Sequence, residues 1–333
     1  MEKNYCQKKQ LLSAVVCTYN RCGLLQNLLE SMCAQSMPKE RLEVIVVDNN
    51  STDNTLEMAY SFEKKFLHYR VLQESQQGPS HARNKGWREA KGEYVAFIDD
   101  DAKVPSDWMA NVFAVIEAQT PDVLGGPIYP YYETEKPLWF KDEYEIRLIQ
   151  NHSGWLAEGH LSGSNMIFRR ELFDEMGGFD TDYGMTAGRL SYGEDTEIIK
   201  RARAQGKKIY YSLDIAVQHH VPQHKMDLFY AMTAAFRNGK ATSDLWWGGD
   251  APLEMLPAIL DSLFAKLDES LDASNRNKER YPFRENYIYE NCFADITSLG
   301  AMVGYAEKYG YAGQKLFEIV KGRLKKRWKK MLG

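Results

Sequence analysis

The chain has 333 residues, of which 44% are hydrophobic and 26% charged, and its formal net charge is −4. This composition argues against a largely disordered protein, and the length predicts one large domain with an appendage, or two domains. Residues 321–333 carry seven basic groups and no acid, so a basic tail follows an acidic body. We expect no nucleic-acid partner.

The cysteines and the N-terminus indicate a reducing compartment. The five cysteines form no Cys-x-x-Cys pair and no His/Cys cluster with zinc spacing, so reduced thiols are expected. The first residues lack the apolar core of a signal peptide, and no run approaches the ~18 apolar residues of a membrane-spanning helix. These features predict a cytoplasmic protein.

The first hundred residues alternate between strand and helix patterns. The strand patterns lie at 11–18, 43–47, 69–72 and 94–98, and the helix patterns at 24–32, from Thr52 or Asp53 to 66, and at 82–90 with Ser80 as its cap. Such alternation predicts a parallel, doubly wound α/β sheet.

The second half is mixed and then helical. Its predicted elements are a helix from Pro105 to 118, strands at 123–128 and 160–169, a helix at 194–204, strands at 209–211 and 216–220, and a helix at 225–239. From Pro252 onward the pattern is helical, with breaks expected near Pro257, Ser274 and Gly310. We therefore predict a first domain over 1–245 and a helical C-terminal region over 246–333.

Three consecutive acids, Asp99, Asp100 and Asp101, end the fourth predicted strand. Three adjacent carboxylates repel one another, so they need water, basic partners or a cation. Oxygen ligands at the carboxyl end of a parallel strand suit Mg²⁺ or Mn²⁺. The alternative is a solvated turn, or a helix N-terminus whose acids complement the helix dipole.

Other polar groups are expected at the same edge of the sheet. Thr18–Arg21 follow the first strand and Asp48 ends the second, where an acid suits an N–H donor of uracil or guanine. Turn and cap chemistry is the alternative for Asp48 and the residues after it. Arg83 and Lys85 lie at the start of a helix, where the N–H groups and the helix dipole favour binding of a diphosphate. The alternative role for these two side chains is surface ion pairing.

Four motifs occur in the order and spacing of family 2 glycosyltransferases, and the chain resembles that family through them. They are Val15–Arg21, Val46–Asp53, Gly78–Gly86 and Phe97–Asp101. The resemblance implies a GT-A fold, a Rossmann-like, mostly parallel mixed sheet flanked by helices. It also implies a nucleotide-sugar donor, a divalent metal (Mn²⁺ or Mg²⁺) and inversion at the anomeric carbon. UDP-sugars are the first expectation, with GDP- and dTDP-sugars left open.

The resemblance also implies roles for individual residues. Asp101 would hold the metal with His219, although a structural histidine is the alternative for His219. The residues implied in donor binding are Thr18, Tyr19, Asn20, Arg21, Asp48, Asp53, Arg83, Asn84, Asp99 and Asp100.

The match continues on the acceptor side through Leu161–Arg169, Gly177–Asp180 and Gly193–Glu197. An attacking hydroxyl loses its proton as the new bond forms, so a carboxylate base is needed there. Asp195 is the predicted base, with Glu194 beside it. The alternative is a pair of acids that cap the helix at 194–204.

The acceptor is expected to be a glycan or a lipid-linked glycan. An aromatic set lies between the metal motif and the acceptor segment, and some of its rings are expected to pack against the sugar rings of the acceptor. Ordinary core packing is the alternative for each member. The set is Tyr129, Tyr131, Tyr132, Trp139, Phe140 and Trp155. Residues 312–333 form a basic amphipathic pattern that suits peripheral contact with the inner face of a membrane, or packing on the body of the protein.

Three other functions are weighed against this prediction. A processive synthase is disfavoured because such enzymes add membrane helices and a Gln-x-x-Arg-Trp motif, whereas Leu324 stands where the Gln would be. A nucleotidyltransferase usually has a Gly-rich loop with Lys or Arg after the first strand, where this chain has Thr18–Arg21. A catalytically inactive sugar- or nucleotide-binding module is the third alternative.

Overall fold

The computed structural model describes residues 11–182, 193–243, 252–309 and 322 of the chain. The chain divides into two compact units. Residues 1–131 and 142–220 form the first, called the sheet unit, and residues 132–141 and 221–333 form the second, called the helical unit. The predicted boundary at 245 lies later in the chain than this division, because the helix that precedes residue 245 packs with the helices that follow it.

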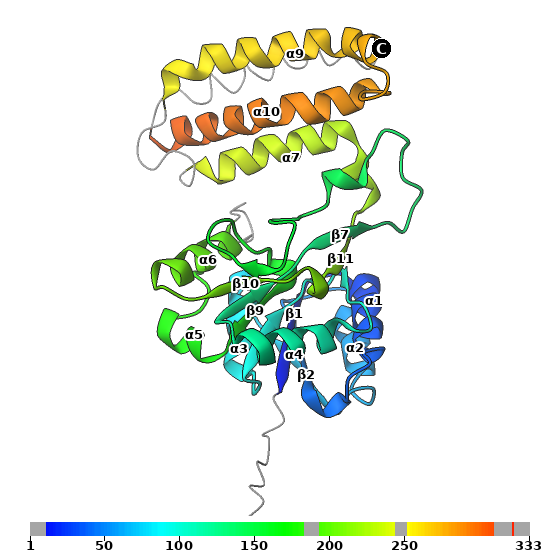
Figure 1. The fold of residues 1–333 in the computed structure, drawn as a ribbon, viewed down its shortest axis with the longest axis vertical. Coiled ribbons are helices and arrows are strands. Elements are labelled where there is room, and N and C mark those ends of the chain that lie inside the picture. The colour runs from blue at the N-terminus through cyan, green and yellow to red at the C-terminus, as the bar shows by residue number, and fades with distance from the viewer. Residues whose placement is uncertain (1–10, 183–192, 244–251, 310–321, 323–333) are drawn as a thin grey trace, which may run out of the picture. The chain divides into compact units, whose positions relative to one another are not determined.

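The sheet unit is built on a mixed sheet flanked by helices (Figure 1). Its strand order in the described residues is β3-β2-β1-β4-β9-β6-β10-β8. Neighbours from β3 to β4 are parallel, as is the pair β6–β10, whereas β9 runs antiparallel to both β4 and β6. The strands are β1 Leu12–Thr18, β2 Leu42–Asp48, β3 His68–Gln73, β4 Tyr94–Phe97, β6 Val123–Gly125, β8 Gly154–Trp155, β9 Met166–Arg169 and β10 Ile209–Tyr211.

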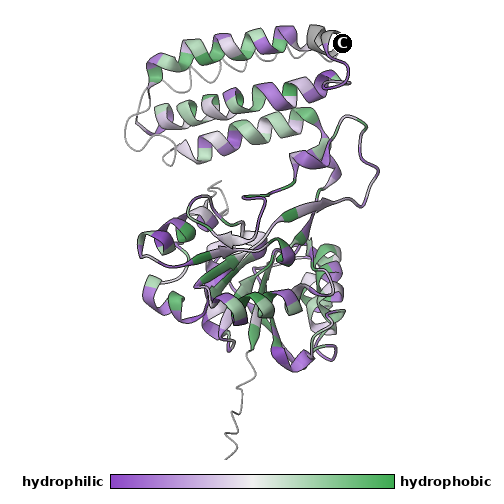
Figure 2. Ribbon diagram, in the orientation of Figure 1, coloured by the Kyte–Doolittle hydropathy of each residue, from purple (hydrophilic) through white to green (hydrophobic). Residues whose placement is uncertain are grey.

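Helices cover both faces of this sheet because its strands are apolar on both sides. In β1, Leu12, Ala14 and Val16 face one core and Val15 the other. The first core is closed by α1 Cys22–Cys33, α2 Thr55–Ser61 and α4 Trp108–Gln119, and the second by α3 Pro79–Glu89, α5 Glu171–Met176 and α6 Glu194–Ala204. Figure 2 shows the hydrophobic residues gathered in the central strands. The predicted α/β class is confirmed.

A smaller sheet brings a second group of polar residues to the carboxyl ends of the main strands. Its order is β5-β11-β7, with β5 Ala102–Lys103, β7 Ile128–Tyr131 and β11 Val217–His220. Ala102 pairs with His219 across β5 and β11. Asp101 directly precedes β5, so this pairing places His219 opposite the end of the acidic triplet.

The strand predicted at 123–128 is wrong in one respect, because two strands in different sheets replace it. Gly126 and Pro127 separate β6 from β7. A Cβ on Gly126 would lie 2.7 Å from the carbonyl oxygen of Ser212, so the chain passes too close to its neighbour for a side chain there.

Helix boundaries also differ from the predictions. Helix α3 begins at Pro79, with Ser80 buried inside its first turn rather than capping it. The break predicted near Pro257 is absent, because proline at the second position of α9 loses no intrahelical hydrogen bond. Helix α2 ends at Ser61 instead of 66.

The helical unit contains three long helices in its described part. They are α7 Leu228–Ala241, α9 Leu256–Arg276 and α10 Arg284–Lys308. Apolar side chains of all three, among them Met232, Leu263 and Ile296, form its core. The short 3-10 turns in the described residues of both units are η1 Lys39–Arg41, η2 Asp142–Tyr144, η3 Gly163–Asn165, η4 Leu213–Ile215, η5 Gln223–Met226 and η6 Leu253–Met255.

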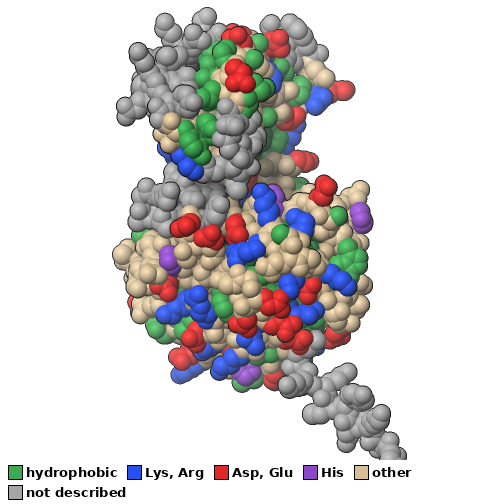
Figure 3. All heavy atoms as spheres, turned by 90° about the vertical axis from the view of Figure 1, so that its left-hand side faces the viewer, with side chains coloured by type: hydrophobic (Ala, Val, Ile, Leu, Met, Phe, Trp, Pro, Cys, Tyr) green, Lys and Arg blue, Asp and Glu red, His purple; other side chains and the backbone are tan. Residues whose placement is uncertain are grey.

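No helix of the described residues is both long enough and apolar enough to cross a membrane. The basic amphipathic pattern at 312–333 lies outside the described residues apart from Gly322. On the face of the sheet unit drawn in Figure 3, acidic and basic side chains are intermingled.

Helices α7 and α10 pack closely enough that glycine is required where they meet. A Cβ on Gly300 would lie 2.0 Å from the carbonyl oxygen of Phe236, and one on Gly239 would lie 1.9 Å from that of Thr297. Gly300→Ala is expected to lower the free energy of unfolding by about 1–3 kcal/mol, measured by denaturant unfolding, because the helices must separate. The control is Gly23→Ala, where α1 leaves open space for the methyl group. An unchanged stability of Gly300→Ala would contradict the packing described.

Candidate functional site

The ends of β1 and β2 lie side by side at one edge of the sheet. Thr18 and Asp48 are partners in the parallel register, and the backbone N–H of Asn49 donates to the carbonyl oxygen of Thr18 at 2.9 Å. Asn20 joins the loops that follow these strands. Its Oδ1 accepts from the N–H of Thr52 at 2.7 Å, while its own N–H donates to Ser51 Oγ at 2.9 Å. Asn20, which was predicted to bind the nucleotide-sugar donor, therefore connects the loops that follow β1 and β2.

Asp48 carries a buried oxygen that the described residues leave without a hydrogen-bond partner. The residue is 1% exposed, and its Oδ2 accepts from the N–H of Ser51 at 3.2 Å. Its Oδ1 has no partner among the described residues. A buried unsatisfied acceptor is costly, so its presence at the sheet edge indicates a place for an N–H donor.

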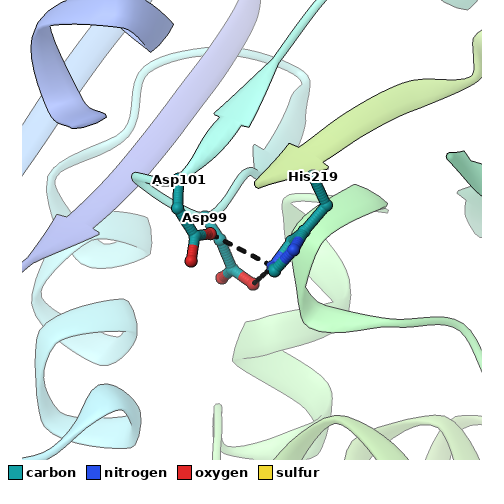
Figure 4. Close-up of side chains that lie close together, drawn as sticks. All are labelled: Asp99, Asp101 and His219. Atoms are coloured by element: carbon teal, nitrogen blue, oxygen red, sulfur yellow. Dashed lines mark ion pairs between the residues drawn. The ribbon is translucent and has the colours of Figure 1, made fainter. Parts of the chain in front are cut away.

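Asp99, Asp101 and His219 form a group of possible metal ligands, in which one ligand atom of each lies within 4.8 Å of the others (Figure 4). His219 Nε2 lies 3.1 Å from Asp101 Oδ1 and 4.0 Å from Asp99 Oδ2. Its other ring nitrogen, Nδ1, lies 3.1 Å from the carbonyl oxygen of His220. A backbone acceptor at Nδ1 favours the tautomer that leaves Nε2 as a lone-pair donor to a cation.

Arg21 forms ion pairs with two acids of the triplet, Asp100 and Asp101. Its Nη1 donates to Asp100 Oδ1 at 2.9 Å and to Asp101 Oδ2 at 2.6 Å, while the side chain is 45% exposed. Burial raises the pKa of Asp100 to about 6, and Arg21 opposes that rise. Asp100 is 5% exposed, so its carboxylate faces the arginine rather than solvent.

Arg83 is buried and connects two acids from distant parts of the chain. Its Nη1 donates to Glu194 Oε1 at 2.8 Å, and its Nη2 lies 3.3 Å from Asp99 Oδ1. Burial acts against the charged form, but Asp99 and Glu194 outweigh it and raise the pKa of Arg83. A Cβ on Gly163 would lie 2.7 Å from Nη2, so glycine makes room for the guanidinium.

These ion pairs leave an excess of negative charge. Four carboxylates (Asp99, Asp100, Asp101 and Glu194) face two guanidinium groups (Arg21 and Arg83). Carboxylate oxygens with one imidazole suit Mn²⁺ or Mg²⁺, so the residues fit the predicted metal.

Two neighbouring residues of the turn η3 donate hydrogen bonds to the predicted base, Asp195, and to the metal-ligand candidate Asp99. The backbone N–H of Gly163 donates to Asp195 Oδ2 at 3.2 Å, and Ser164 Oγ donates to Asp99 Oδ2. Asp195 Oδ1 accepts from the N–H of Thr196 at 2.7 Å, as expected for an acid in the first turn of a helix. Gly193 is the N-cap of α6, so Asp195 does not cap the helix. Its place in the first turn fits an interaction with the helix dipole as well as the catalytic prediction.

Two residues that were predicted to bind the nucleotide-sugar donor, Asn84 and Asp53, have local structural roles. The amide of Asn84 is buried; its oxygen accepts from the N–H of Phe179 at 2.8 Å, and its nitrogen donates to the carbonyl of Phe179 at 2.8 Å. Gly178 has a φ of +79°, and a Cβ there would lie 2.5 Å from Asn84 Oδ1. Asp53 Oδ1 accepts from the N–H of Thr55 at 3.0 Å at the start of α2.

Tyr19 is 47% exposed at the edge of the site, and its ring is accessible to a ligand. Ser164 was not predicted as a site residue, although it lies in a motif that resembles the family. Nothing in the local pattern reveals its hydroxyl contact with Asp99, because 65 residues separate the two.

Residues 13–177 match the family described as Glycosyl transferase family 2. Among curated relatives, a glucosyl-dolichyl phosphate glucuronosyltransferase of Haloferax volcanii is 28% identical over 68% of this chain and 75% of its own. The succinoglycan biosynthesis protein ExoM of Rhizobium meliloti is 26% identical over 68% of this chain and 72% of its own.

Solved structures share the fold. The mannosyltransferase PcManGT of Pyrobaculum calidifontis, in complex with GDP-Man and Mn²⁺, aligns with a TM-score of 0.53 and 20% identity over 95% of this chain and 80% of its own. TarS 1-349 of S. aureus, in complex with UDP, aligns with a TM-score of 0.52 and 20% identity over 90% of this chain and 92% of its own. The predicted GT-A fold is confirmed. The chain belongs to glycosyl transferase family 2 and is a glycosyltransferase.

Proposed function

We propose that this glycosyltransferase moves a sugar from a nucleoside diphosphate, UDP first, to a hydroxyl group of a glycan or lipid-linked glycan, with metal assistance and inversion at the anomeric carbon. The observation that carries this proposal is the turn at Gly163 and Ser164, which contacts the predicted base Asp195 and the metal-side acid Asp99. An acceptor hydroxyl near Asp195 would therefore be close to the donor's diphosphate.

Asp48 supports a donor whose base carries an N–H group. Its buried Oδ1 lacks a partner among the described residues and accepts hydrogen bonds only, when ionised. The imide N–H of uracil or thymine, or the N1–H of guanine, satisfies it. Cytosine and adenine present an unprotonated ring nitrogen at the equivalent position and are disfavoured.

Asp99, Asp101 and His219 would hold the divalent cation. When bound, such a cation neutralises charge that builds up on the leaving diphosphate. Arg21 contributes to the same task, because its exposed guanidinium lies beside the acids and carries N–H groups on Nε and Nη2 beyond the Nη1 that the two acids bind. Asp100 would orient Arg21 rather than contact the metal.

The transfer is a single displacement. The acceptor hydroxyl oxygen forms a bond to the anomeric carbon, and the bond from that carbon to the diphosphate oxygen breaks with its electron pair leaving on the diphosphate. The hydroxyl proton passes to the Asp195 carboxylate. Glu194 is committed to Arg83 at 2.8 Å, so Asp195 is the more available acid for this step.

The relatives support the proposal at the level of their printed names. PcManGT is described with a GDP-sugar and Mn²⁺, TarS with UDP, and the Haloferax relative as a transferase acting on a dolichyl phosphate glycan. These descriptions favour a nucleotide-sugar donor with Mn²⁺, and they leave GDP-sugars open beside UDP-sugars.

Donor turnover tests the proposal directly. Incubation with UDP-, GDP- and dTDP-sugars and Mn²⁺ is expected to release nucleoside diphosphate from one class, and NMR of the product is expected to give the inverted anomer. Release of pyrophosphate from a nucleoside triphosphate and a sugar phosphate would support a nucleotidyltransferase instead. Binding of a donor without turnover in the presence of glycan acceptors would support an inactive binding module.

Asp48→Asn is expected to weaken UDP binding by about tenfold to a hundredfold, because the amide presents an N–H where the base needs an acceptor. Isothermal calorimetry with UDP and Mn²⁺ measures the effect. Asp182→Asn, an exposed acid of the same unit, serves as the matched control. Equal UDP affinity in Asp48→Asn and wild type would remove Asp48 from the base site.

A further inference from the structure

The helical unit contains a cavity of about 380 Å³ that the proposed reaction does not use. This volume lies within the range of small-molecule sites in proteins. Its walls come from three segments: the loop at 132–141, the beginning of α7 with the turn before it, and the first turn of α10. Residues from distant parts of the chain therefore converge on one hollow.

The cavity is held open by contacts between the loop and α10. The side-chain amide of Asn286 donates to the backbone carbonyl of Trp139, and Lys141 Nζ lies 2.6 Å from Glu290 Oε1. The Trp139 ring also packs at 6.1 Å from the ring of Tyr289. These contacts join the loop to α10 beside the cavity.

Aromatic and polar side chains line the cavity together. Trp139 forms part of one wall, and Phe229, which is 56% exposed, lies at the beginning of α7. The polar lining residues are Gln223, Asp227, Arg284 and Glu285. A sugar ring matches this combination, since its C–H face packs on an aromatic ring while its hydroxyls donate to carboxylates and accept from guanidinium and amide N–H groups.

The polar groups retain capacity for a ligand. Asp227 uses Oδ1 to accept from the N–H of Tyr230 at 2.8 Å, which leaves Oδ2 available. Arg284 is half-buried and makes no hydrogen bond or ion pair with the residues that the structure describes. One cation, Arg284, against two acids, Asp227 and Glu285, gives the lining a net negative charge, which disfavours phosphates and uronic acids and so favours neutral sugars over anionic ones.

We propose that this cavity binds neutral sugar residues of the acceptor glycan, as a site separate from the donor site. The acceptor role rests on the proposed function, whereas the binding of glycan does not. The chain reaches the cavity at Gln223, four residues after the metal-ligand candidate His219. Trp139 then accounts for one member of the aromatic set that was predicted to contact the acceptor.

Binding of neutral oligosaccharides to the full chain, without donor or metal, tests this proposal. Tetrasaccharides of the cello, malto, chito and manno series serve as probes, with saturation-transfer NMR and calorimetry as readouts. At least one series is expected to bind. Arg284→Ala and Trp139→Ala are expected to weaken that binding at least tenfold, and Trp139→Phe to retain most of it because an aromatic ring remains.

Three outcomes would overturn the proposal: no series binds, only anionic oligosaccharides bind, or both alanine variants bind like the wild type while circular dichroism shows them folded. Asp101→Ala separates this proposal from the proposed function, since it should lose Mn²⁺-dependent UDP binding and keep glycan binding. If wild type transfers no sugar yet binds glycan through Trp139 and Arg284, the cavity stands as a glycan site and only the acceptor role fails.

Discussion

Asp195→Asn is expected to lower the turnover number for sugar transfer by about 10²–10⁴-fold, the usual contribution of a positioned general base. The amide cannot take the hydroxyl proton. It keeps the shape of the carboxylate, and its single oxygen can accept from one of the two N–H groups, of Gly163 and Thr196, that the carboxylate binds. Steady-state kinetics of transfer measure the loss. Calorimetry with UDP and Mn²⁺ is expected to give near-wild-type affinity, because the proposed function places Asp195 on the acceptor side.

Glu194→Gln is the matched control for this prediction. Its carboxylate is 2.8 Å from Arg83 Nη1, and removing its charge leaves that buried guanidinium with Asp99 as its remaining partner. We expect a lower melting temperature and a smaller loss of turnover than in Asp195→Asn. The reverse order, with Glu194→Gln inactive and Asp195→Asn active, would assign the base to Glu194.

Local pattern predicted much of the sheet unit. The strands at β1 and β10 and the helix α6 lie within one residue of their predicted bounds, because apolar spacing and flanking polar residues are local signals. Strand direction is not a local signal. The residues of β9 form an apolar run like those of β4, yet β9 is antiparallel to its neighbours, since direction depends on the path of the chain between strands.

The residues of the candidate site that follow strand ends could be predicted from the sequence. The residues placed by ion pairs between distant parts of the chain could not. Thr18, Asp48 and the acidic triplet lie together because the carboxyl ends of parallel strands share an edge. Arg83, predicted to face a diphosphate, is instead buried between Asp99 and Glu194, and its partner Glu194 is 111 residues away in the chain. The position of Arg83 near the start of a helix predicts a negatively charged partner. It does not show whether that partner is a substrate or a carboxylate of the protein.

Asp101→Asn is expected to weaken the Mn²⁺-dependent part of UDP binding by at least about 100-fold, since even the residues that support metal ligands contribute about 10–100-fold to affinity. Asp101 contacts His219 through Oδ1 and Arg21 through Oδ2. The substitution therefore removes the charge of a metal-ligand candidate and leaves Asp100 as the acid of the triplet that pairs with Arg21. Calorimetry of UDP binding with and without Mn²⁺ measures the effect independently of turnover.

Asp107→Asn provides the control for Asp101→Asn, because Asp107 is an exposed acid six residues further along the chain. It should leave the Mn²⁺ dependence unchanged. If Mn²⁺ strengthens UDP binding equally in Asp101→Asn and wild type, Asp101 does not hold the metal. The metal would then be held by other residues, and Asp99 and His219 would be the first to test.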